Sequence, residues 1–390
     1  MRMKRGDIRQ LMLAGLMLLM FVACSSDSHE EQDPVLNIYV YSPGKPMMTR
    51  SVTEPTAEEK KVHSLTLWVY KSSSSMQLGS ITLNAEELAS LNEKEMGVYT
   101  MPVTSIFARN PEPVDVYVLA NVSANNTGTT LDPTIADKTS MENALFNGGY
   151  YYQFARQDKD YTAVTELSKE GLPMSGVVRG KAVTNVNSVL HVTDANLQLV
   201  RDVSKVRFVF SSLESEDHVY IDEVKLDANM LYNSSYLFLN DEHPYFRVGS
   251  NGLFGHEVVL VKKLTDKDGY PQYVNRNKNP RQYAYQSGMD ETAYEALIKE
   301  GLEKNELTEA PVVYLPESDK RLTGTITFHL SGTPGEQHTA SFMMLNGDFR
   351  RNQTWIVYVY YTGSTRLEVT SVKVTDWEDV GEYNQNVHNW

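Results

Sequence analysis

Apolar and polar residues alternate with a period of two through most of the chain, and this pattern predicts a mostly β fold. The predicted strands are rich in β-branched and aromatic residues and are bounded by Pro, Gly, Ser or Asn. They cover residues 35–41, 65–70, 114–120, 195–200, 203–210, 220–226, 323–330, 354–361 and 367–377. Short strands separated by turn signals are typical of β-sandwiches.

Helical patterns are few. Residues 84–91 and 140–146 are each predicted to form one or two turns, and residues 290–304 an amphipathic helix. Asp290 is the predicted N-cap of that helix. Its apolar face consists of Tyr294, Leu297, Ile298 and Leu302.

A turn-rich stretch at residues 175–187 separates two runs of strands and predicts two tandem domains. The boundary is expected within residues 180–195, which gives an N-terminal sandwich of 35–190 and a C-terminal sandwich of 191–390. Residues 230–320 are rich in Tyr, Asn and Lys and are interpreted as a long insertion. Long loops on a β scaffold are where recognition tends to occur.

The N-terminal segment has the pattern of an export signal. Four basic residues precede the apolar run 11–22, and Ala23 and Cys24 follow it. The run is too short to cross a hydrocarbon core of about 30 Å as a helix, so residues 1–23 are predicted to be a signal peptide. Cys24 is the only cysteine in the chain and is the predicted lipidation site. Residues 24–34 are then expected to form an acidic, solvated tether.

The chain is acidic, with a formal net charge of −14, and loss of the basic signal peptide makes the charge more negative. This argues against nucleic acid as a partner. A single cysteine also excludes disulfides within the chain, so stability has to come from a buried core.

No catalytic or metal-binding motif is present. The nine histidines are scattered, and the sequence lacks a His-Glu-x-x-His pair, a phosphate-binding loop, a Gly-x-Ser-x-Gly turn and a calcium loop. We therefore expect no enzyme activity, cofactor or metal. A hydrolase with carboxylates that the sequence does not pair is the remaining enzymatic alternative.

Several short phrases, taken in order over about 300 residues, resemble the fimbrillin family, the subunits of type V pili. They are residues 116–122 (VYVLANV), 172–176 (LPMSG), 197–206 (LQLVRDVSKV), 314–317 (YLPE), 351–355 (RNQTW) and a Trp near the C-terminus. The resemblance implies two transthyretin-like β-sandwiches, export as a lipoprotein, and removal of the first strand by an arginine-directed protease. The fold class is therefore predicted as all-β, with two tandem transthyretin-like β-sandwiches and a few short helices.

On this resemblance, residues 35–50 would be the removable first strand and its linker. The candidate cleavage bond joins Arg50 and Ser51, and Arg50 is the only arginine between Ala23 and Arg109. Lys60 and Lys61 are an alternative for a lysine-specific protease, and an unclipped chain is another. The apolar residues of the removable strand are Val35, Leu36, Ile38 and Val40.

Removing a strand leaves unpaired backbone groups and an apolar groove, which an extended segment of the next subunit can fill. The candidate donor is residues 367–390, and a phase shift near Ser371 suggests a bulge or a bend. Its apolar residues are Leu367, Val369, Val372, Val374 and Trp377. The alternative is that this segment is the last strand of its own domain.

The resemblance predicts a fimbrial subunit at the outer membrane and cell surface, held first by its lipid. The expected partners are copies of the chain, tip and anchor proteins, and a host or bacterial surface ligand. A stalk subunit is the first hypothesis, while a tip, accessory or anchor subunit remains open. A glycan-binding surface lipoprotein is the alternative from another class. The aromatic run at residues 150–154 could stack on sugars or dock a partner, although packing against the second domain is the favoured interpretation.

Overall fold

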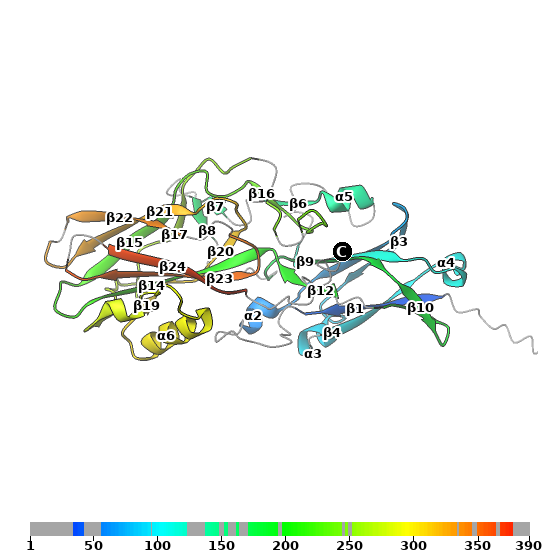
Figure 1. Ribbon diagram of the computed structural model, residues 1–390, viewed down its shortest axis with the longest axis horizontal. Helices are drawn as coiled ribbons and strands as arrows, with labels where there is room; N and C mark the ends of the chain where they lie inside the picture. Colours follow the sequence, from blue (N-terminus) through cyan, green and yellow to red (C-terminus); the bar gives the residue numbers. More distant parts are fainter. Residues whose placement is uncertain are drawn as a thin grey trace, which may run out of the picture.

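The computed structural model describes residues 34–42, 56–94, 96–122, 137–147, 152–154, 161–163, 171–193, 197–243, 246–248, 252–333, 335–344, 349–363 and 367–376. Of residues 152–154, 161–163 and 372–376 it describes the backbone. The described residues form two β-sandwiches that lie end to end along the longest axis of the molecule (Figure 1).

The first sandwich has two sheets. One has the order β10-β11-β1-β12, with β4 paired to β1, and the other has the order β13-β9-β5-β2-β3. In the first sheet the strands are β1 (Val35–Tyr41), β4 (Met96–Pro102), β10 (Val183–Val186), β11 (Val189–Val192) and β12 (Leu197–Gln198). In the second they are β2 (Leu65–Lys71), β3 (Gln77–Leu83), β5 (Val114–Ala120), β9 (Met174–Lys181) and β13 (Val200–Arg201).

The second sandwich also has two sheets. One has the order β18-β14-β23-β24, with β19 and β20 also paired to β14, and the other has the order β22-β21-β15-β17-β8-β7. The first contains β14 (Val203–Leu213), β18 (Arg276–Asn277), β19 (Thr308–Glu309), β20 (Val313–Pro316), β23 (Gln353–Tyr361) and β24 (Leu367–Asp376). The second contains β7 (Tyr152–Phe154), β8 (Tyr161–Ala163), β15 (Val219–Leu226), β17 (Val258–Val261), β21 (Thr323–Leu330) and β22 (Gln337–Met343).

Short helices and one small sheet complete the described elements. The helices are α2 (Ala57–Lys60), α3 (Ala89–Lys94), α4 (Ser105–Arg109), α5 (Lys138–Glu142), η2 (Pro280–Tyr283) and α6 (Glu291–Glu303). The small sheet pairs β6 (Leu145–Asn147) with β16 (Ser234–Tyr236). In Figure 1, α2 lies between the two sandwiches and α6 covers one face of the second.

Burial explains why these segments fold as they do. β1 and β21 alternate between buried and half-buried side chains, as expected for strands with one face toward the core. β5 and β23 are buried on both faces, which fits their nearly continuous apolar sequences. One cluster of buried apolar residues continues through both sandwiches, so the core is not interrupted at their junction.

The predicted fold class, all-β with tandem β-sandwiches and few short helices, is confirmed. The predicted amphipathic helix is present as α6, whose N-cap Asp290 accepts a hydrogen bond from the amide of Ala293 at 3.0 Å. Tyr294 and Ile298 are buried against the outer face of β14 and β23. The helix prediction is wrong for residues 145 and 146, which form β6 because they pair with a distant segment, β16.

Three segments differ from the expected domain limits. β12 and β13 follow residue 190, yet they pair with β1 and β9 of the first sandwich, and β14 begins the second only at Val203. β7 and β8 precede residue 190, yet they lie in a sheet of the second sandwich. Residues 230–320 are not an insertion outside the sandwich, because β17, β18, β19 and β20 all pair within its sheets. These strands are two to four residues long, too short for an alternating pattern to reveal.

Candidate functional site: the slot of the first strand

β1 lies inside its sheet, between β4 on one side and β11 and β12 on the other. All seven of its residues pair antiparallel with β4, from Val35 opposite Pro102 to Tyr41 opposite Met96. On the other side, the first half of β1 runs parallel to β11 and its end runs parallel to β12. β1 therefore occupies a slot that offers backbone hydrogen bonds along both edges.

Alternate side chains of β1 point into the core of the first sandwich. Leu36, Ile38 and Val40 are each 0% exposed, whereas the strand's other side chains are half-buried. Complete burial of one such side chain stabilises a fold by roughly 1.5–3 kcal/mol. On the opposite face, the Tyr39 hydroxyl lies 3.0 Å from Nδ1 of His191, which links β1 to β11.

These contacts define what the slot can hold. Without β1, the facing edges of β4, β11 and β12 would expose unpaired N–H and C=O groups, and the inner face would expose an apolar groove. An extended segment with apolar side chains at alternate positions would satisfy both surfaces. β4 pairs along the whole length of β1, so such a segment would form the most backbone hydrogen bonds by running antiparallel to β4.

The residues expected to undergo lipidation and cleavage lie outside the described residues. These are Cys24, Arg50 and Ser51, and the same is true of Trp377 near the C-terminus. The aromatic run at residues 150–154 is described only as the backbone of β7. Val35, Leu36, Ile38 and Val40 are in β1, and Leu367, Val369, Val372 and Val374 are in β24.

β24 is at the edge of the second sandwich, antiparallel to β23. Leu367 is buried, and Val369 packs against the apolar cluster that continues through both sandwiches. Ser371 donates a hydrogen bond to the carbonyl of Met343 at 3.0 Å. The pairing register shifts by one residue so that Val374 has no partner position on β23, which is a bulge. The structure therefore shows this segment as a strand of its own domain.

The chain after the candidate cleavage bond is held at the junction of the two sandwiches. Glu59 in α2 is almost fully buried, and its carboxylate lies 2.9 Å from Lys205 Nζ and 2.8 Å from the Tyr314 hydroxyl, both in the second sandwich. The Glu59 carbonyl accepts a hydrogen bond from Arg201 Nε at 3.0 Å. Burial alone would raise the pKa of Glu59, but the charge of Lys205 and the hydrogen bonds that Glu59 accepts hold it below its usual value.

A second buried network lies beside the first. The guanidinium of Arg351 contacts Asp202 Oδ1 at 2.6 Å and holds Glu317 in a bidentate pair. Ser175 of β9 donates a hydrogen bond to Asp202 Oδ1 at 2.8 Å, which ties the first sandwich into the network. Complete burial raises the pKa of Asp202 to about 7, because burial and the nearby Glu317 outweigh Arg351 and Ser175.

Sequence reasoning missed this junction, although its residues other than Glu59 belong to the phrases on which the family resemblance rests. Residues far apart in the chain converge there, so no local pattern shows that they meet. The available signal was a set of charged and polar residues within or next to otherwise apolar strands, a pattern typical of buried polar networks. They are Ser175, Arg201, Asp202, Lys205, Tyr314, Glu317 and Arg351.

Among the described residues, no three His, Cys, Asp or Glu side chains are grouped so that they could hold a metal ion. In the same part of the chain, no helix has the length and apolar character needed to span a membrane.

Comparison with known proteins gives matches in structure alone. No family model and no curated protein matches the chain. A candidate cell adhesion protein from Parabacteroides distasonis ATCC 8503 matches with a TM-score of 0.55 and 15% identity, covering 89% of this chain and 98% of its own. A second candidate cell adhesion protein, from Bacteroides eggerthii DSM 20697, matches with a TM-score of 0.50 and 14% identity, covering 87% and 95%.

The tip fimbrial protein Mfa3 from Porphyromonas gingivalis, with a C-terminal truncation, matches with a TM-score of 0.49 and 14% identity, covering 87% of this chain and 98% of its own. At identities this low, structural similarity shows a shared fold and not a shared activity. The chain thus has the two-sandwich fold found in the first two of these proteins, over nearly their whole length.

Proposed function

We propose that this chain is a structural subunit of a surface fimbrium and that it supports adhesion. The observation that supports this most directly is the position of β1. It is the first described strand of the chain, yet it lies in the middle of a sheet, and residues 43–55 connect it to the rest of the fold. A single cut in that connection would make the strand exchangeable for an equivalent segment of another molecule.

In this proposal the chain is exported as a lipoprotein, acylated at Cys24, and reaches the outer membrane and cell surface. Cleavage between Arg50 and Ser51 then separates the lipid and β1 from the rest of the chain. The arrangement of α2 supports this order of events. Glu59 ties the downstream side of the cleavage region to the second sandwich, so the cut would release β1 without loosening the body of the subunit.

The incoming strand in the fibre would be residues 367–390 of the next copy. Support comes from the edge position of β24, because an edge strand can leave its sheet by breaking one ladder of hydrogen bonds. Leu367 and Val369, or Val372 and Val374 in the other phase, would then enter the slot. Trp377 would follow beyond the end of β24.

A tip or accessory subunit is the second candidate, and the way β24 is held favours it. Glu368 accepts hydrogen bonds from Arg281, Tyr360 and Thr362, at 2.8, 2.7 and 3.2 Å. α6 lies against the same strand. A strand with these ties is retained more readily than donated, and a subunit that keeps its last strand would accept a neighbour without extending the fibre.

The decisive experiment combines specific cleavage with sizing. The chain is treated with an arginine-specific protease, and its mass and oligomeric state are measured in parallel with an Arg50→Ala variant. We expect the wild type to begin at Ser51 and to form a ladder of oligomers, and the variant to remain monomeric. Arg109→Ala is the matched control, since Arg109 is an exposed arginine at the end of α4. Equal polymerisation of the Arg50→Ala variant would refute the maturation step.

A further inference from the structure

The two sandwiches exchange segments across their junction. Residues 234–239, here called the strap, belong to the second sandwich by sequence but pair with β6, which comes from the first half of the chain. β16 runs antiparallel to β6, and the Leu237 amide donates to the Ala144 carbonyl at 2.9 Å. In the other direction, β8 of the first half of the chain runs parallel to β17 in the second sandwich. The domains are therefore interlocked rather than simply adjacent.

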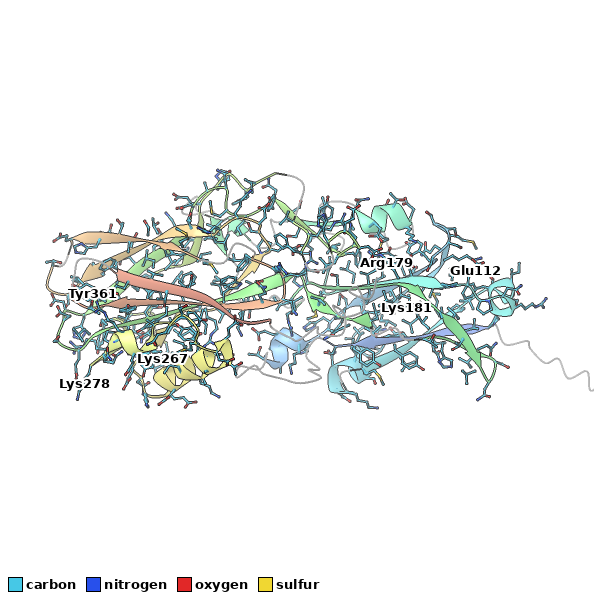
Figure 2. The ribbon with its side chains drawn as sticks, viewed as in Figure 1. Glu112, Arg179, Lys181, Lys267, Lys278 and Tyr361 are labelled. Atoms are coloured by element: carbon cyan, nitrogen blue, oxygen red, sulfur yellow. The ribbon has the colours of Figure 1, made fainter. Side chains whose placement is uncertain are left out.

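The strap is held by its backbone. Three arginine side chains donate hydrogen bonds to its four successive carbonyl groups between residues 236 and 239. The pairs are Arg351 with Tyr236 and Leu237, Arg247 with Phe238 at 3.1 Å, and Arg179 with Leu239 at 2.9 Å. Arg179 comes from β9 of the first sandwich (Figure 2). It also forms a bidentate pair with Glu142 of α5, so it connects the strap to both β9 and α5.

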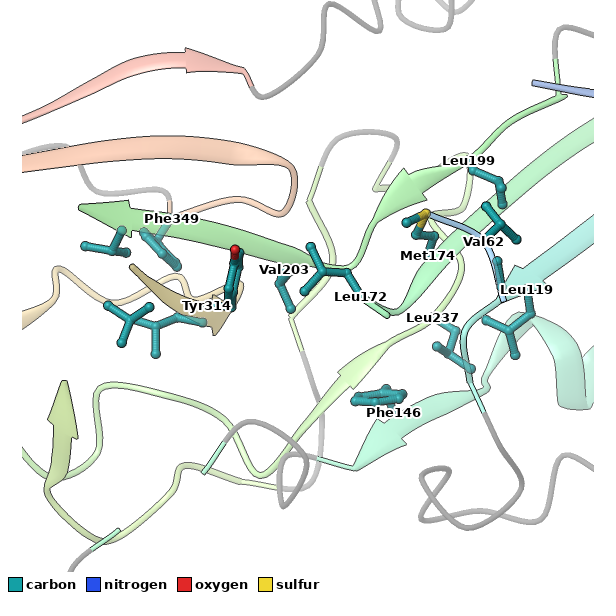
Figure 3. Packing of buried hydrophobic residues seen from close by; sticks show 14 of the residues in the cluster. Val62, Leu119, Phe146, Leu172, Met174, Leu199, Val203, Leu237, Tyr314 and Phe349 are labelled. Carbon is teal, nitrogen blue, oxygen red and sulfur yellow. The ribbon is translucent and has the colours of Figure 1, made fainter. Parts of the chain in front are cut away.

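The strap side chains are buried against the first sandwich. Phe238 is 1% exposed and meets the edge of the Tyr117 ring, with the ring centres 5.2 Å apart. Leu237 is fully buried, and Figure 3 shows it close to Phe146 and Leu119. The contact is apolar in the middle and polar along the backbone, which is the composition of a stable interface.

The strap and β1 contact opposite faces of the sheet that contains β5. A Cβ added to Gly176 would lie 2.5 Å from the backbone of Gln198 in β12, so the face shared by Gly176 and its partner Val118 points toward the β1 sheet. Side chains alternate along a strand, so Tyr117 points to the other face, where the strap lies. Removal of β1 would therefore leave the contacts of the strap intact.

We propose that the strap is an internal scaffold that keeps the first sandwich folded while its slot is empty. This rests on the proposed function, in which β1 departs before another strand arrives. In that interval the β1 sheet has lost its central strand and cannot stabilise the fold. The sheet of β5 and β9 remains fixed to the second sandwich through the strap, so the slot keeps its shape and stays ready to accept a strand.

The test compares four forms of the protein, and it requires neither protease nor polymerisation. They are the wild type, a chain lacking residues 34–42, and each of these with Phe238→Ala. Hydrogen exchange is followed by mass spectrometry in β5 and β9. We expect the deletion alone to change exchange there by less than about tenfold, and Phe238→Ala to accelerate it by about 100-fold or more only when β1 is absent.

Phe342→Ala is the matched control, because Phe342 is an equally buried phenylalanine in β22 of the second sandwich. It should leave exchange in β5 unchanged, with or without β1. The proposal is overturned if the deletion alone exposes β5 and β9, or if Phe238→Ala has the same effect in both backgrounds.

Arg179→Met provides a milder variant in case Phe238→Ala prevents folding. It removes the hydrogen bond to Leu239 and the pair with Glu142 but leaves the apolar contact, so we expect the same pattern with a smaller increase. The result is separate from that of the cleavage experiment. A chain that passes the exchange test but never polymerises after cleavage would retain the scaffold and refute the proposed polymerisation of the subunit.

Discussion

β1 and β24 are the first and last described strands of the chain, and their sheets hold them in different ways. β1 has neighbours along both edges, and three of its side chains are completely buried. β24 is at the edge of its sheet, and its inward positions hold Leu367, Val369 and the hydroxyl of Ser371. A bulge at Val374 further interrupts its pairing with β23.

The difference indicates which strand suits each role in a fibre. A slot with two edges and an apolar floor binds an extended segment strongly and in one register. An edge strand with one ladder and fewer buried apolar groups can be withdrawn at a lower cost. The same comparison also shows a conflict, because α6 and Glu368 hold β24 in place.

The largest expected effect comes from deleting residues 367–390. If β24 is the donor, the deletion leaves a folded monomer that can accept a strand but cannot extend a fibre, so polymer is lost completely. Sizing and circular dichroism of the cleaved protein measure both properties. Unfolding of the second sandwich in the deleted chain would instead identify β24 as an essential internal strand.

Single substitutions should destabilise the chain more in β1 than in β24. Ile38→Ala removes a fully buried side chain and should lower the free energy of unfolding by about 2–5 kcal/mol. Val369→Ala removes a partly buried side chain at an edge and should cost roughly 1 kcal/mol. Urea denaturation of the uncleaved chain gives both values. Equal losses would contradict the contrast between a central and an edge strand.

The sequence predicted these strands well because alternation and β-branched residues report local burial. Residues 35–41 and 114–120 were predicted with the limits that β1 and β5 have. The sheet order was not predictable, since pairing of β1 with β12 joins residues that no local pattern relates. The same applies to the junction, where Glu59 meets Tyr314 across 255 positions. Such contacts depend on the complete topology.

A pH-dependent effect is expected at the junction. Burial raises the pKa of Asp202 to about 7, above its value in an unfolded chain. The folded state therefore binds the proton more tightly, and the contribution of Asp202 to stability falls as pH rises from about 4 to about 7. The melting temperature of the wild type minus that of Asp202→Asn should decline over this range. A rise over the same range would show that Arg351 keeps Asp202 ionised.

The smallest expected effect comes from weakening the polar contacts that hold β24. Arg281 and Glu368 form a solvent-exposed pair, so Glu368→Gln should change the melting temperature by about 2 °C or less. Glu300→Gln is the matched control, because Glu300 pairs with Lys304 on α6 and contacts no part of β24 in that pair. If the strand is donated, weakening its ties should accelerate fibre growth after cleavage in the Glu368→Gln variant alone. An unchanged growth rate would show that release of β24 does not limit assembly and would contradict this prediction.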